Sequence, residues 1–232
     1  MRTFYVRGLF LLFILASFSL PVCASSSNQK NATLEITTGS VKGHSHFFVD
    51  KGEVLMPKVA VAALFIEPHG TPREHINNIG PIKAAHARDA VNESISYLRT
   101  AAGARSIFKR IDKSGGVIII VVNNSCENAQ SPGKNTSIAI VLWDPSCAYR
   151  FKKGTVSPSI TLLHELVHAM HQFENPAHYF ARAGLNNKDY DNDEERETII
   201  NGEMPVAIEL GEAIRYNHKE GQTFFVYDPT LR

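Results

Sequence analysis

The sequence predicts an α+β domain in which a small β-sheet packs beside one long helix. Two runs of branched apolar residues, Val117–Val122 and Ser137–Trp143, have the length and composition of buried strands. The run Ile160–His171 repeats apolar residues at helical spacing, after a helix start with Ser157 as cap and Pro158 at the first position. With 232 residues, 44% of them hydrophobic, the chain is long enough for one sizeable core.

The first residues have the pattern of a secretory signal peptide. Arg2 and Arg7 give it a positive start, Gly8–Leu20 is an apolar segment too short to span a bilayer comfortably, and Ala24 ends it with a small residue. We therefore expect residues 1–24 to be a signal peptide that is cleaved after Ala24. The mature protein would then be secreted or periplasmic, with no stable membrane association.

The rest of the chain predicts one domain after a short linker. Residues 25–32 are rich in Ser, Asn, Gln and Lys and are expected to be a disordered linker, and residues 33–232 form the domain. Without the signal peptide the chain carries 22 basic and 23 acidic residues, so it has no basic surplus for binding nucleic acid.

Two cysteines remain after cleavage, Cys126 and Cys147. In an oxidising compartment they are natural disulfide partners, because they lie near the ends of two strands expected to be neighbours. Two buried free thiols are the alternative.

The other elements follow from local patterns. Before Val117 we expect strands at Thr33–Thr37 and His44–Val49, a loop at 67–81, a helix at Ile82–Arg99 and a short helix at Ser106–Ile111, while 54–66 is left unassigned. Beyond it we expect a polar loop at 123–135, a break at Asn175-Pro176, a polar loop at 186–193, a helix at Glu194–Ile200 capped by Asp193, a helix at Val206–Tyr216 opened by Pro205, and a docked tail at 223–232.

Within the long helix, His164, Glu165 and His168 form the pattern His-Glu-x-x-His. Histidines at i and i+4 lie on one face of a helix, so two imidazole nitrogens can reach one Zn²⁺ at about 2.0–2.1 Å. The glutamate lies beside the metal, where it can take a proton from the attacking water and later give one to a leaving amine. The alternative is a pair of hydrogen-bonded core histidines, but a buried unpaired Glu165 would then be costly.

A catalytic zinc ion needs a further protein ligand. His171 lies on nearly the same face of the helix, but one helix rarely supplies three ligands, and His178 follows a proline. A carboxylate from a second helix is therefore preferred. Glu195 is the first choice, with Glu194 a close second and Glu197 third, although acidic residues at a helix start also stabilise the helix dipole.

Three segments in order, His164–His171, Glu194–Ile199 and Glu209–Tyr216, resemble the NleD-like family of secreted effector zinc metallopeptidases. The similarity covers roughly residues 82–218. It implies a zincin-like metallopeptidase domain, a zinc-dependent endopeptidase activity and a protein or peptide substrate. In such a family the substrate is often a host protein, and some members cut mitogen-activated protein kinases.

The leading interpretation is a secreted zinc metallopeptidase. His164, His168 and Glu195 would hold Zn²⁺, and Glu165 would act as the general base. The alternative is a catalytically silent, secreted zincin-fold protein that binds a partner. A zinc hydrolase for a non-peptide substrate would share the same metal site.

Four further side chains near the end of the domain are assigned less closely. Tyr216, His218 and Tyr227 are candidates for stabilising the oxyanion, and the sequence does not rank them. Arg215 is expected to form a structural salt bridge.

Overall fold

The computed structural model describes residues 45–50, 56, 58–66, 86–133, 135–218 and 221–232. The signal peptide, the linker, the strand at Thr33–Thr37 and the loop at 67–81 lie outside the described residues and stay predictions. Within them, every helix is too short or too polar to span a lipid bilayer.

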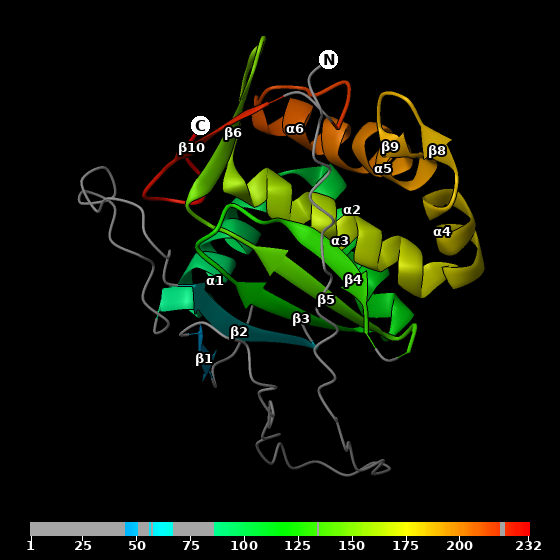
Figure 1. Cartoon of the computed structure of the whole chain (residues 1–232), viewed down its shortest axis with the longest axis horizontal. Helices are drawn as coiled ribbons and strands as arrows, with labels where there is room; N and C mark the ends of the chain where they lie inside the picture. Colours follow the sequence, from blue (N-terminus) through cyan, green and yellow to red (C-terminus); the bar gives the residue numbers. More distant parts are fainter. Residues whose placement is uncertain (1–44, 51–55, 57, 67–85, 134, 219–220) are drawn as a thin grey trace, which may run out of the picture. The chain divides into compact units, whose positions relative to one another are not determined.

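A five-stranded sheet forms the base of the domain, in the order β1-β2-β3-β5-β4 (Figure 1). Its strands are β1 (Ser45–Asp50), β2 (Val59–Ile66), β3 (Val117–Val122), β4 (Ala129–Pro132) and β5 (Ile138–Trp143). Strands β2, β3 and β5 are parallel, whereas β1 and β4 are antiparallel at the two edges. The two strands predicted most clearly are thus direct neighbours at the centre of the sheet.

The loop predicted at 123–135 was partly wrong, because it contains the edge strand β4. Its four residues, Ala-Gln-Ser-Pro, carry no alternation of apolar and polar side chains. An edge strand pairs on one side only and can end in proline without losing a ladder bond. Backbone pairing with β5, rather than side-chain burial, therefore makes this segment a strand.

Helices α1 (Ala87–Leu98), α2 (Ala102–Ser114) and α3 (Pro158–Glu174) follow the predicted order, and α4 (Pro176–Ala183) is a helix that the sequence analysis did not predict. Figure 1 shows α3 running along the sheet beside β4, and α3 also contacts β5, α1 and α2. The apolar side chains of these elements form one core. The predicted helix at Ser106–Ile111 is longer at both ends, and α4 begins directly after the predicted break.

Helix α3 is fixed to the sheet at both ends. Ser157 caps its N-terminus by accepting a hydrogen bond from the Ile160 amide, and Pro158 occupies the first turn, as predicted. The indole of Trp143 at the end of β5 donates to the carbonyl of Pro158 (2.8 Å). At the other end Gln172 donates to the carbonyl of Ile138 (2.9 Å). The position of α3 along its axis is therefore set by hydrogen bonds that the core shields from water.

After α4 the chain forms a short hairpin, β8 (Asn186–Asn187) and β9 (Asp191–Asn192), and then three helical pieces without a break. These are α5 (Asp193–Glu197), the π-helix η3 (Thr198–Glu203) and α6 (Met204–Leu210).

The predictions for this region were wrong at five points. The loop predicted at 186–193 contains β8 and β9, and the helix predicted to end at Ile200 continues through η3 into α6. The cap is Asn192, which accepts from the Glu195 amide, and not Asp193. Pro205 lies in the first turn of α6 but continues an existing helix. The last helix stops at Leu210 because Gly211, with φ 68°, turns the chain into the left-handed region.

A second sheet, in the order β10-β6-β7, joins β6 (Cys147–Phe151) and β7 (Gly154–Val156) to β10 (Gln222–Phe225). The pairing of β10 with β6 confirms that the tail is docked. Cys147 begins β6 and forms a disulfide with Cys126, with Cα atoms 5.3 Å apart, as the sequence predicted. The bridge fixes the loop between β3 and β4.

Removal of the disulfide should lower the free energy of unfolding by about 3 kcal/mol, because the bridge closes a loop of 21 residues in the unfolded chain. The measurement is urea denaturation of the protein and of the Cys126→Ala/Cys147→Ala variant. Reductant should destabilise the former and leave the variant unchanged. Equal stability of the oxidised protein and the variant would contradict the prediction.

Candidate metal centre

Helix α3 places His164, Glu165 and His168 at the base of an open cavity of about 240 Å³, and all three side chains are buried. Ala129 and Gln130 of β4 line one side of this cavity, and α4 and α5 line others. Sequence reasoning placed the first three residues on one helical face. The structure adds that all three residues line the same cavity.

The two histidines turn their Nε2 atoms toward each other, 3.1 Å apart, with the rings nearly perpendicular. Glu195 of α5 approaches from the opposite side. Its Oε2 atom lies 3.0 Å from Nε2 of His164 and 3.3 Å from Nε2 of His168. Three potential ligand atoms from two helices thus converge on one point.

The spacing of these three atoms fits a tetrahedral zinc site. Bonds of about 2.0–2.1 Å in a tetrahedron separate the ligand atoms by roughly 3.3 Å. The three observed separations, 3.0, 3.1 and 3.3 Å, approach that value. The structure therefore brings together His164, His168 and Glu195, which the sequence proposed as the ligands. Their role in binding metal stays a prediction.

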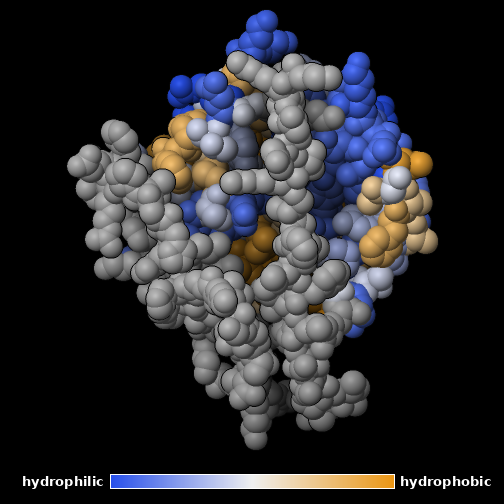
Figure 2. Space-filling model, in the orientation of Figure 1, coloured by the Kyte–Doolittle hydropathy of each residue, from blue (hydrophilic) through white to orange (hydrophobic). Residues whose placement is uncertain are grey.

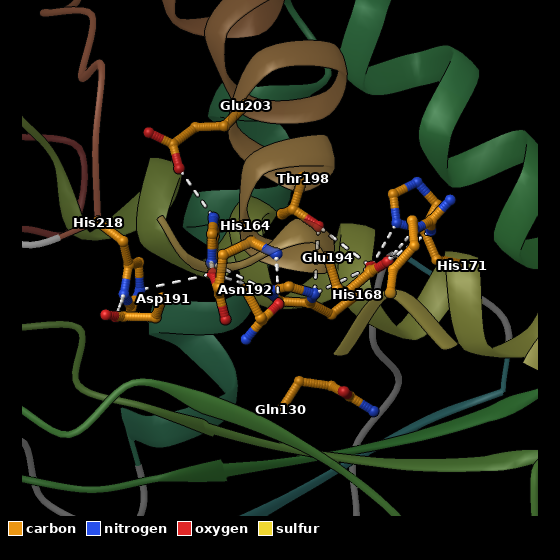
Figure 3. Close-up of polar contacts among 12 residues, drawn as sticks. Gln130, His164, His168, His171, Asp191, Asn192, Glu194, Thr198, Glu203 and His218 are labelled. Carbon is orange, nitrogen blue, oxygen red and sulfur yellow. Dashed lines mark hydrogen bonds and ion pairs between the residues drawn. The ribbon is translucent and has the colours of Figure 1, made fainter. Parts of the chain in front are cut away.

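On the far side of its ring, His164 is held by a buried ion pair. Its Nδ1 atom lies 3.0 Å from Oε2 of Glu203 (Figure 3). Arg215 binds the same carboxylate, with Nη2 at 2.5 Å from Oε2. Arg215 Nη2 is also 2.7 Å from Nδ1 of His164. Because Arg215 only donates, Nδ1 of His164 either donates to Glu203 or accepts from Arg215, depending on the tautomer, while the carboxylate accepts from Arg215 in both cases. The salt bridge predicted for Arg215 is confirmed.

His168 is held in the same way by Glu194. Its Nδ1 atom lies 3.2 Å from Oε1 of Glu194, which also accepts from Nδ1 of His171 (2.6 Å). The other oxygen of Glu194 accepts from Arg182 of α4 (2.7 Å). Glu194, the second choice as ligand, therefore faces the outer nitrogen of His168 and not the converging atoms. A carboxylate in this position fixes the tautomer of a ligating histidine.

These hydrogen bonds determine which ion can occupy the space between the three converging atoms. In the tautomer in which each Nδ1 donates to its carboxylate, the neutral rings of His164 and His168 direct their lone pairs at each other and at Glu195. Three lone pairs this close repel one another unless a cation lies among them. The donor set of two imidazoles and one carboxylate suits Zn²⁺.

The pKa values follow from the same arrangement. Burial alone would lower the pKa of His168, but hydrogen bonds to Glu194 and Glu195 raise it to about 10. Burial alone would raise the pKa of Glu194, but hydrogen bonds from His168 and His171 lower it to about 2. In the metal-free protein a proton on His168 thus supplies the central positive charge. Burial raises the pKa of Glu165. A raised pKa makes a carboxylate a better proton acceptor, as a general base requires.

Zinc affinity should therefore increase at least tenfold per pH unit between pH 6 and pH 9, because binding must displace the proton of His168. The pKa of this ring in the folded, metal-free protein lies above that interval, so the proton is still present at its upper end. The increase should be steepest toward pH 6, where His164, whose pKa is also raised, carries a proton as well. Competition titrations against a chelator of known proton affinity at several pH values measure this slope. An affinity independent of pH would contradict the assignment of His168.

The π-helix η3 determines where Glu203 lies. A π-helix widens the turn and shifts the helical phase, and such segments are frequent at functional sites. Gly202 lies against Val167 of α3 so closely that an added Cβ would be 2.7 Å from a methyl carbon of that side chain. This contact lets η3 approach α3 and brings the Glu203 carboxylate to His164. Sequence reasoning missed Glu203, and periodicity offered no signal for it, because the π-turn breaks the usual phase.

The remaining candidates lie as follows. His171 contacts Glu194 and His178 contacts Arg182, so neither reaches the converging atoms. His218 lines the cavity, whereas Tyr216 and Tyr227 are exposed side chains outside its lining.

Solved structures similar to this chain include light chains of Clostridium botulinum neurotoxins. The serotype F light chain is 13% identical, with a TM-score of 0.37 over 56% of this chain and 49% of that one. A catalytic domain of serotype F is 12% identical, with a TM-score of 0.38 over 60% and 53% of the two chains. The serotype HA light chain is 12% identical, with a TM-score of 0.32 over 49% and 47%.

The chain thus spans about half the length of the solved structures that it matches. Neither a family model nor a curated protein matches it. The functional argument therefore depends on the geometry of the site.

Proposed function

We propose that this protein is a zinc-dependent peptidase. The observation that carries the proposal is the convergence of His164, His168 and Glu195 within 3.0–3.3 Å, with Glu165 buried on the same helix face. Two imidazoles and one carboxylate leave a tetrahedral ion with one open position, which is typical of catalytic zinc and not of structural zinc.

The bound ion would supply Lewis-acid chemistry, polarising the scissile carbonyl and lowering the pKa of water to about 7. Glu165 accepts the proton of the attacking water and passes it to the leaving amine. Its burial raises its pKa, so that the protonated form is less unfavourable than at an exposed glutamate. Glu203 and Glu194 hold the two imidazoles in the tautomer that presents Nε2.

The edge strand β4 supports an extended peptide as the substrate. Within the described residues β4 pairs with β5 alone, and two of its residues, Ala129 and Gln130, line the cavity. An extended peptide can add to such an edge through backbone hydrogen bonds, which places its carbonyl groups beside α3. Gln130 is held by the hydroxyl of Tyr179 (2.7 Å) and by Gln172, so the strand is firmly positioned.

Apolar side chains near the cavity are consistent with a protein or peptide substrate. Figure 2 shows an apolar patch over α4, where Phe180 and Leu185 are about half exposed. The ring of Phe180 contacts that of Tyr179, which lines the cavity, and an exposed apolar patch of this kind favours a protein partner. The predicted signal peptide and the disulfide support action in the periplasm or outside the cell. Host proteins are among the candidate substrates.

The experiment is a cleavage screen of the purified mature chain against a peptide library, with and without one equivalent of Zn²⁺, read by mass spectrometry. We expect hydrolysis that depends on zinc and is lost with a chelator. Stoichiometric zinc binding with no cleavage of any peptide or protein would instead support the alternative, a catalytically silent binding protein.

A further inference from the structure

A third histidine, His218, faces the three converging atoms. Its Nε2 atom lies 3.5 Å from Oε2 of Glu195. The ligand atoms of His164, Glu195 and His218 all lie within 4.8 Å of one another. The rings of His164 and His218 are nearly parallel, with centroids 5.9 Å apart and planes at 18°. His218 lies far from the histidine motif in sequence, and no spacing rule connects the two.

The outer nitrogen of His218 is held by a carboxylate, as in the other two histidines. Nδ1 of His218 lies 2.7 Å from Oδ2 of Asp191 (Figure 3). The His218 amide donates to the carbonyl of Asp189 (3.1 Å). Asp191 adopts φ 66°, a left-handed conformation that side chains other than glycine enter rarely. The hairpin thus holds Asp191 in an unfavourable backbone geometry and directs its carboxylate at His218.

The three histidines share one pattern. Each has Nδ1 beside a carboxylate, Glu203 for His164, Glu194 for His168 and Asp191 for His218, and each turns Nε2 inward. A carboxylate that accepts the Nδ1 proton leaves a neutral ring with a lone pair on Nε2, which is the form that binds a metal ion.

His218 differs from the other two histidines in its exposure. Its side chain is 34% exposed and that of Asp191 is 48% exposed, whereas the side chains of His164 and Glu203 are 4% and 2% exposed. His218 is also slightly too far from the centre, because 3.5 Å exceeds the edge of roughly 3.3 Å that tetrahedral zinc requires. A ring that is one third exposed has room to move toward the ion and away from it.

We propose that His218 is a fourth, displaceable protein ligand of the metal, which closes the shell in the resting protein and leaves it when substrate enters. This inference rests on the zinc site of the proposed function. The resting ion would be held by three imidazoles and one carboxylate. Such a cap keeps the metal in place between turnovers, and the substrate must compete with His218 for the open position.

The test is X-ray absorption at the zinc edge on the zinc-loaded mature chain, together with zinc affinity from chelator competition. We expect three imidazole ligands in the unaltered protein and two in His218→Ala, with zinc bound at least tenfold more weakly. Asp191→Asn should weaken zinc binding in the same direction by orienting the ring less well. The matched control is His86→Ala, an exposed histidine before α1 whose side chain makes no capping bond, which should leave both readouts unchanged.

Two results would overturn the inference. Zinc with only two imidazoles in the unaltered protein, and an affinity that His218→Ala does not change, would show that His218 does not bind the ion. If that variant then lost affinity for a peptide hydroxamate, His218 would be assigned to the substrate instead. A protein that bound no zinc at all would overturn the proposed function as well. In that case His164→Ala would have the same zinc affinity as the unaltered protein.

Discussion

Replacement of Glu165 by glutamine should leave one zinc ion bound and reduce kcat by a factor of about 10² to 10⁴, the range for removal of a general base. The amide keeps the size of the side chain and its place on α3 but cannot accept a proton. Glu165 contributes no atom to the three converging separations, so the metal shell should be unaffected. Single-turnover cleavage of a peptide found in the screen measures the rate, and metal analysis measures the zinc.

The control for this variant is Glu174→Gln on the same helix. Glu174 pairs with Arg110 (2.8 Å, Nε to Oε1) at the far end of α3, outside the cavity lining. The Glu174→Gln variant should cleave the peptide at the rate of the unaltered protein. Normal turnover by Glu165→Gln would remove Glu165 from the mechanism, while loss of zinc would mean that Glu165 itself is a ligand.

Replacement of Glu195 by glutamine should weaken zinc binding by a factor of about 10² to 10³. A zinc site worth about 10–16 kcal/mol that is shared by four ligands loses roughly a quarter of that energy with one of them. Glu195 is the only acidic side chain among the three converging atoms. Isothermal titration of zinc into the metal-free variant measures the loss.

Replacement of Glu194 by glutamine should affect stability more than metal binding. Its carboxylate is buried and binds Arg182, His168 and His171, so its neutralisation removes the buried negative charge that these three side chains share and costs about 3–5 kcal/mol of unfolding free energy. Zinc affinity should fall by a factor of about 10 to 100, as for other groups that orient a ligating histidine. Thermal unfolding of the metal-free variants separates the two effects.

Glu197, the third choice from the sequence, serves as the control in both experiments. Its side chain accepts from Asn201 (2.8 Å) one turn further along the chain. Glu197→Gln should keep zinc affinity and stability unchanged. A larger loss of zinc in Glu194→Gln than in Glu195→Gln would reverse the assignment of the third ligand.

Two kinds of residue were predictable for different reasons. The strands β3 and β5 are buried, and their unbroken apolar runs reflect that burial directly. The positions of His164, Glu165 and His168 followed from helical spacing, because i and i+4 share a face whatever surrounds the helix. Glu195 was preferred over Glu194 on helical phase alone, and the structure brings Glu195 to the two Nε2 atoms.

Other features could not be predicted from the neighbouring residues in the sequence. The edge strand β4 exists because β5 offers it backbone partners, and its own side chains have no pattern. Glu203 reaches His164 through a π-turn that changes the phase of the helix. The approach of η3 to α3 depends on Gly202 against Val167, which is a contact between distant segments.

The sequence by itself determined which functional groups α3 presents: two imidazoles and a carboxyl group on one helix face. It also gave a short set of acidic candidates for the third metal ligand. Only the tertiary structure decided which carboxylate faces each nitrogen, because Glu195, Glu194, Glu203 and Asp191 reach their histidines across 26 to 39 residues of chain. Local periodicity fixes the direction of a side chain relative to its own helix. The distance between two helices depends on how their surfaces pack.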